Sequence, residues 1–107
     1  MTLDSVVPSR ILIFGKDRML LYTRALVLQR AHFVADVATD METLKSRLAA
    51  PELKCRAVVC CYTAAENERE EIVALTTRSQ LPMLQLHRIV QPDSLIAQLS
   101  TLLGRQL

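Results

Sequence analysis

The chain has little glycine and few aromatic residues: 2 glycines in 107 residues, no tryptophan, and 4% phenylalanine and tyrosine together. The sequence also contains no internal repeat or low-complexity stretch, and its composition indicates an ordered chain. No apolar run approaches the ~20 residues of a membrane-spanning helix, and the amino terminus lacks the charged start and long apolar stretch of a secretory signal. We therefore expect a cytoplasmic protein with no membrane association.

Neither the charged residues nor the cysteines form a pattern that indicates a nucleic-acid, zinc or redox site. The 13 basic and 11 acidic residues give a net charge of +2 and form no basic stripe, so we expect no nucleic-acid binding by the chain itself. Cys55, Cys60 and Cys61 lack the C-x-x-C spacing of zinc and redox sites and agree with a reducing compartment. With no glycine-rich phosphate loop either, the sequence predicts neither a metal nor a cofactor.

Apolar residues, in contrast, make up 50% of the chain, which is ample for the core of one domain of this length. Four short apolar runs read as buried strands, and each is followed by a stretch with helical periodicity. This alternation predicts a parallel sheet with helices on both faces. The strands are expected at 11–14, 33–38, 57–62 and 82–86, the helices at 17–31, 40–50, 64–78 and 93–103, after a tail over residues 1–9 and within one domain over 10–107.

Local signals place the helix ends and the inward faces. Asp17 and Asp40 are expected to cap the first two helices, Pro51 to end the second, and Gly104 to end the last. Asp36 interrupts the second apolar run and indicates a partly wet edge strand. Spacings of three and four residues predict these inward positions: Leu21, Tyr22, Ala25, Leu26 and Leu28 in the first helix, Met41, Leu44 and Leu48 in the second, and Ile72, Val73 and Leu75 in the third.

Several segments resemble the receiver domains of bacterial response regulators. Residues 10–17 read Arg-Ile-Leu-Ile-Phe-Gly-Lys-Asp, similar to the strand that opens a receiver and ends in two acids. Residues 32–40 and 56–61 resemble the second and third receiver strands, and the segment from Pro92 resembles the one after the family's Lys-Pro pair. The resemblance implies a three-layer α/β/α, flavodoxin-like fold with strand order 2-1-3-4, in which the fifth strand is short or missing because only residues 87–90 are left to form it.

The resemblance also locates the phosphorylation site of the family, and every position there differs. The Mg²⁺-binding acids fall on Gly15 and Lys16, the phosphorylated Asp on Cys61, the Ser/Thr near His87 and the Lys on Gln91. Mg²⁺ prefers carboxylate oxygens, and phosphoryl transfer depends on such a metal and on positive charge at the moving group. We therefore expect a non-enzymatic, non-phosphorylatable receiver-like module that acts through protein contacts in bacterial signal transduction.

Loss of the elements that normally follow the fourth strand would leave that strand as an uncovered edge, and an apolar edge favours a partner. The expected interface is formed by Leu84, Leu86, Leu95 and Leu99, in a homodimer or with another protein of the pathway.

Three alternatives use the carboxyl end of the sheet. Cys60 and Cys61 could form a thiol sensor, or they could be buried residues that face opposite sides of a strand. His87 could be a phosphohistidine or a metal ligand in a phosphotransfer protein, or a solvated loop residue. Lys16 could bind an anion in a small-ligand sensor, or it could be a solvated lysine.

Overall fold

The computed structural model describes residues 9–50 and 54–104, and strands and helices alternate along them. The observed strands begin or end within one or two residues of the expected positions. The expected tail, apart from Ser9, lies outside the described residues, as do Pro51 and residues 105–107. The elements are β1 (Arg10–Phe14), α1 (Arg18–Arg30), β2 (Val34–Ala38), α2 (Met41–Ala49), β3 (Ala57–Cys60), α3 (Glu66–Arg78), β4 (Met83–Gln85) and α4 (Pro92–Leu102).

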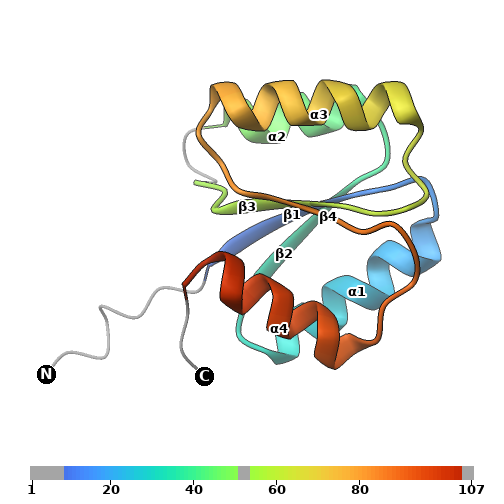
Figure 1. Ribbon diagram of the computed structural model, residues 1–107, viewed down its shortest axis with the longest axis vertical. Helices are drawn as coiled ribbons and strands as arrows, with labels where there is room; N and C mark the ends of the chain where they lie inside the picture. Colours follow the sequence, from blue (N-terminus) through green and yellow to red (C-terminus); the bar gives the residue numbers. More distant parts are fainter. Residues whose placement is uncertain (1–8, 51–53, 105–107) are drawn as a thin grey trace, which may run out of the picture.

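The four strands form one parallel sheet in the order β2-β1-β3-β4. Helices α2 and α3 cover one face of the sheet, and α1 and α4 cover the other (Figure 1). The structure therefore confirms the three-layer, flavodoxin-like fold class and the position of β2 at an edge. β4 forms the other edge, and the connection over residues 86–91 adds neither a helix nor a further strand.

Each face of the sheet has its own buried core. Ile11, Ile13 and Val59 pack with the helices α1 and α4, whereas Leu12, Phe14 and Val58 pack with α2 and α3. Successive strand residues point to opposite faces. Because helices cover both faces, every position of a central strand has to be apolar. The two layers together bury every residue of the central strands β1 and β3 except Arg10.

Helix ends follow the local signals closely. Asp17 accepts a hydrogen bond from the Leu20 amide at 3.1 Å, and Asp40 accepts one from the Thr43 amide at 2.7 Å, so both expected caps are confirmed. Gly104 has a φ of +69° directly after α4, which is the left-handed geometry for which glycine is preferred at a helix end. α1 ends in the same geometry without glycine, because His32 has a φ of +70°.

On two helices part of the predicted inward face is wrong, although Leu21, Ala25, Leu28 and Ile72 are buried as expected. In α1, Tyr22 and Leu26 are 57% and 58% exposed, and Arg24 is buried instead. These two residues follow Leu21 and Ala25 by one position, which turns them about 100° away from the sheet. In α3, Val73 is 48% exposed for the same reason, and the position that packs inward after Ile72 is Thr76.

Within residues 9–50 and 54–104, no helix combines the length and the apolar character required to cross a membrane.

Candidate functional site

The carboxyl ends of the parallel strands meet at one edge of the sheet, where ligands of open α/β sheets usually bind. Gly15 follows β1 at this edge and is buried. A Cβ atom on Gly15 would lie 2.8 Å from Thr63 Oγ1, 3.1 Å from Cys61 Cβ and 3.2 Å from Leu21 Cδ2. A side chain at this position would therefore require Thr63 in the connection after β3, and to a smaller extent Cys61 and Leu21, to shift.

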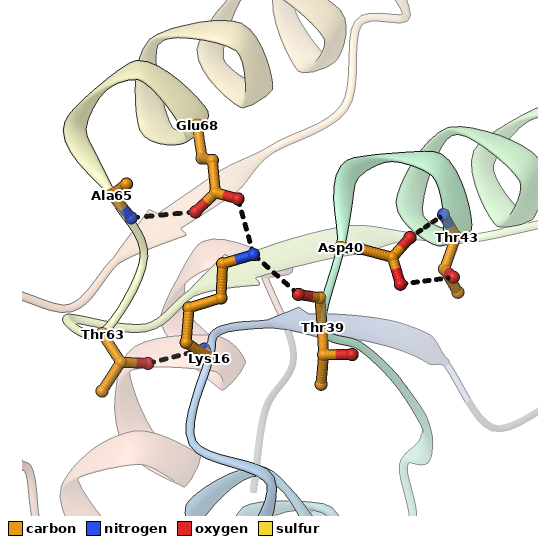
Figure 2. Close-up of polar contacts among 7 residues, drawn as sticks. All are labelled: Lys16, Thr39, Asp40, Thr43, Thr63, Ala65 and Glu68. Carbon is orange, nitrogen blue, oxygen red and sulfur yellow. Dashed lines mark hydrogen bonds and ion pairs between the residues drawn. The ribbon is translucent and has the colours of Figure 1, made fainter.

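Lys16 is the centre of a polar network at the same edge (Figure 2). Its ammonium nitrogen Nζ lies 2.7 Å from Glu68 Oε2 and donates to the Thr39 carbonyl oxygen at 2.9 Å. The Lys16 backbone amide donates to Thr63 Oγ1 at 3.0 Å, and the ammonium lies 5.6 Å from the centre of the Phe14 ring. The Lys16 ammonium therefore already has a carboxylate and a carbonyl partner. This disfavours both the solvated-lysine and the anion-binding interpretations.

The acidic side chains near this edge are bound to helix termini. Asp17 and Asp40 cap α1 and α2, and Glu68 accepts a hydrogen bond from the Ala65 amide at 2.9 Å at the start of α3. Bonds from the Thr43 amide and hydroxyl lower the pKa of Asp40. Burial alone would raise the pKa of Glu68, but the bonds from Lys16 and Ala65 outweigh it and lower the pKa.

Cys60 and Cys61 face opposite sides of the sheet, Cys60 toward α2 and α3 and Cys61 toward α1 and α4. This confirms that both are buried, but only Cys60 belongs to β3, and Cys61 directly follows the strand. Burial raises the pKa of both thiols to about 11, so neither is a thiolate near neutral pH. The arrangement disfavours the thiol-sensor alternative.

The remaining positions of the expected site are dispersed. His87 is exposed after β4 and borders a shallow hollow with residues of α3, among them Glu66 and Glu70. Gln91 is exposed at the start of α4, where its side chain makes no capping bond. Gly15, Lys16 and Cys61 do come together around Thr63, whereas His87 and Gln91 make no contact with Lys16.

The expected interface needs a correction. Leu86, Leu95 and Leu99 are 2%, 1% and 0% exposed, so they belong to the core and offer no surface to a partner. Their helical spacing in α4 is the pattern of a face packed on the sheet, and α4 is packed there. Leu84 remains partly exposed and borders an apolar groove of about 350 Å³ beside α4.

The sequence did not predict two residues that bind Lys16 at this edge. Thr63 and Glu68 both bind Lys16, from a connection and a helix distant in the chain, and no local pattern marks such long-range partners. Among the residues whose positions are described, no cluster of three or more His, Cys, Asp or Glu side chains is placed to hold a metal ion.

No protein-family model matches the chain, and no curated protein is a significant match to it.

Proposed function

We propose that the chain is a receiver-like module that is not phosphorylated and acts through protein contacts in cytoplasmic bacterial signal transduction. The strand order 2-1-3-4 with helices on both faces and the resemblance of residues 10–17 to a receiver opening support this proposal. On this interpretation the protein is not an enzyme.

The observation that carries the proposal is the network around Lys16. By the resemblance to receivers, Lys16 stands at a position of the metal-binding acids, and its ammonium is bound by Glu68 and by the Thr39 carbonyl oxygen. A fixed positive charge repels a metal ion. The position expected for the acceptor carboxylate holds the buried thiol of Cys61, which cannot form an acyl phosphate.

Incubation with acetyl phosphate and Mg²⁺, followed by intact-mass measurement, tests this part of the proposal. We expect no gain in mass under conditions in which an ordinary receiver domain, used as the positive control, is phosphorylated. A gain of one phosphoryl group on the native chain would refute the proposal. The stability of any adduct in alkali should be measured, because an alkali-stable, acid-labile phosphohistidine at His87 would favour the phosphotransfer alternative instead.

The interaction surface that we propose is the exposed side of β4 with the groove beside it. Leu84, Ala97 and Thr101 border this groove together with Gln98 and Leu102. Among the described strands β4 pairs with β3 alone, and the outer side of such an edge strand can pair with another chain. A second copy of the chain can use the same edge by two-fold symmetry, and a homodimer is the first assembly to test.

Sedimentation velocity from 1 µM to 1 mM tests for the homodimer, with concentrations chosen to bracket weak self-association. Thr101→Arg places a charge in the groove, and Thr77→Arg places the same charge on the exposed face of α3, away from it. We expect Thr101→Arg to weaken self-association at least about tenfold, with Thr77→Arg unchanged. A native chain that stays monomeric throughout, or equal effects of both variants, would contradict this surface.

A further inference from the structure

Arg24 lies in the middle of α1 with a buried side chain whose polar atoms are only partly satisfied. The residue is 4% exposed, and its guanidinium nitrogens Nε and Nη2 have no hydrogen-bond partner within residues 9–50 and 54–104. An arginine stays protonated in proteins. Burying donors of a cation without acceptors is destabilising unless an anion or other acceptor binds them, and the described residues supply none for Nε and Nη2.

Arg24 lines a cavity between α1 and the connection from β4 to α4. Its volume is about 180 Å³, and the connection passes beside α1 before α4 begins (Figure 1). We call it the Arg24 cavity. Its other lining residues are Leu20, Thr23 and Val27 from α1, Ile89 and Val90 from the connection, and Pro92 and Leu95 from the start of α4.

The walls of the Arg24 cavity are apolar and carry no negative charge. No aspartate or glutamate lines it, and the Thr23 hydroxyl already donates to the Met19 carbonyl oxygen at 2.9 Å. Arg24 is therefore the one charged residue in a lining that is otherwise mostly apolar. This combination suits a ligand with one anionic end and an apolar body.

We propose that the Arg24 cavity is a binding site for a small aliphatic carboxylate. The guanidinium presents two parallel N–H donors that match the two oxygens of a carboxylate, and Leu20, Val27 and Val90 contact the aliphatic chain. An apolar cavity of about 150 Å³ accommodates benzene, so the Arg24 cavity is sized for about six to eight non-hydrogen atoms. An inorganic phosphate would leave most of its oxygens against apolar walls, which penalises it relative to a carboxylate.

This site is separate from the network around Lys16 and from the groove beside β4. Its lining shares no residue with the groove, so ligand binding and self-association can succeed or fail independently. The failure of one proposal is thus distinguishable from the failure of the other.

The direct test is a titration of the native chain with hexanoate, followed by calorimetry and by methyl chemical shifts. We expect a dissociation constant of about 0.1 to 1 mM, given the small size of the ligand, with the largest shifts at Leu20, Val27, Val90 and Leu95. Hexan-1-ol should bind at least about tenfold more weakly, because it loses the charge-assisted bonds. Equal affinity for hexan-1-ol, or tighter binding of phosphate than of hexanoate, would overturn the proposal.

Variants locate the site. Arg24→Leu should abolish hexanoate binding while raising the melting temperature, since it removes buried donors that lack acceptors. Ile89→Asp places a carboxylate at a residue that is 65% exposed and borders the cavity, and it should weaken hexanoate binding at least about tenfold through charge repulsion. Leu26→Asp is the matched control, because Leu26 is exposed on α1 but does not line the cavity.

Ile89→Asp also keeps the proposal testable if Arg24→Leu fails to fold. Undiminished hexanoate binding by Ile89→Asp, or equal losses in Ile89→Asp and Leu26→Asp, would place the ligand elsewhere. No binding of hexanoate by the native chain at 10 mM, about ten times the weakest expected dissociation constant, would refute the site.

Discussion

The ammonium of Lys16 lies 2.7 Å from a carboxylate oxygen of Glu68, and this pair joins the connection after β1 to the first turn of α3. The other oxygen of Glu68 accepts from the Ala65 amide, while Lys16 also donates to the Thr39 carbonyl oxygen ahead of α2 (Figure 2). Three separate segments at the carboxyl edge of the sheet are thus held by one lysine. The polar residues at this edge therefore stabilise the fold.

Lys16→Met should destabilise the fold by about 1 kcal/mol, because it removes a charge-assisted pair whose carboxylate is largely buried. The side chain of Glu68 is 13% exposed, while that of Lys16 is 45% exposed, so solvent screens the pair only in part. Urea denaturation followed by circular dichroism measures the change.

Lys45→Met is the matched control for this substitution. Lys45 forms an ion pair with Glu71, in which both side chains are about half exposed. Its loss should cost no more than about 0.5 kcal/mol. A larger loss of stability in Lys45→Met than in Lys16→Met would contradict the structural importance of the Lys16 network.

Stability should fall at acid pH, because the pKa values of Asp40 and Glu68 are lowered from ordinary values of 3.8 and 4.5. A carboxyl group whose pKa is lower in the folded state stabilises the fold above its unfolded pKa and ceases to do so as the pH falls through the folded pKa. The urea midpoint should therefore hold from pH 7 to about 5 and decline below about 4.5.

The same pH series on Lys16→Met tests how far Lys16 controls this acid transition. Without the bond from Lys16, the pKa of Glu68 rises toward or above its ordinary value, so the acid decline should be shallower in this variant. An unchanged slope would mean that Lys16 does not control the titration of Glu68.

Gly15→Ala should destabilise the fold by about 1 to 3 kcal/mol, the usual cost of overpacking. The added Cβ would lie 2.8 Å from Thr63 Oγ1. Combining Gly15→Ala with Thr63→Ala should give less destabilisation than the two separate changes predict, because the clash is shared. Strict additivity of the free energies of unfolding would show that Thr63 is not the residue that restricts position 15.

Cys60 and Cys61 should be unreactive toward thiol reagents in the folded chain. With pKa values of about 11, their thiolate fraction near pH 7.5 is on the order of 100-fold below that of an ordinary cysteine. Ellman's reagent, followed over time in buffer and in urea, measures this. Rapid labelling of Cys61 in buffer would revive the thiol-sensor interpretation.

His32→Gly should stabilise the fold by up to about 1 kcal/mol, because the left-handed conformation strains a residue with a Cβ atom. The Phe33 amide donates to the Leu28 carbonyl oxygen at 3.0 Å and the His32 amide to that of Gln29 at 3.1 Å, so the backbone bonds of this helix end remain in place. Gln29→Gly, inside α1, should instead cost about 1 kcal/mol. Thermal unfolding distinguishes the two.

The sequence was most informative where one local rule applied. Fully apolar runs such as Ile11–Phe14 identified the central strands, and single residues such as Asp17 and Gly104 marked the helix ends. The face of α1 was less certain, because Leu21, Tyr22, Ala25 and Leu26 cover two adjacent stripes of the helix. Periodicity alone does not decide which stripe packs on the sheet, and the burial of Arg24 opposes its usual preference for solvent.

The site was least predictable from the sequence. The position of Lys16 at the edge followed from the strand that precedes it, but its partners Glu68 and Thr63 become neighbours only once the sheet has assembled. The leucines of α4 could not be assigned from the sequence either. A spacing of three or four residues is expected both for a helix face that packs on the core and for one that binds a partner. Leu95 and Leu99 belong to the core.

The parallel sheet also has a consequence for how the chain folds. Every strand pairing joins segments separated by at least one complete helix, as Arg10 with Val34 and Val58 with Met83 show, so no hairpin can form early from neighbouring residues. Loop closure must therefore precede most of the pairing. We expect folding to be slower than that of a helical bundle of the same length, with β4, whose single pairing completes the sheet, joining last.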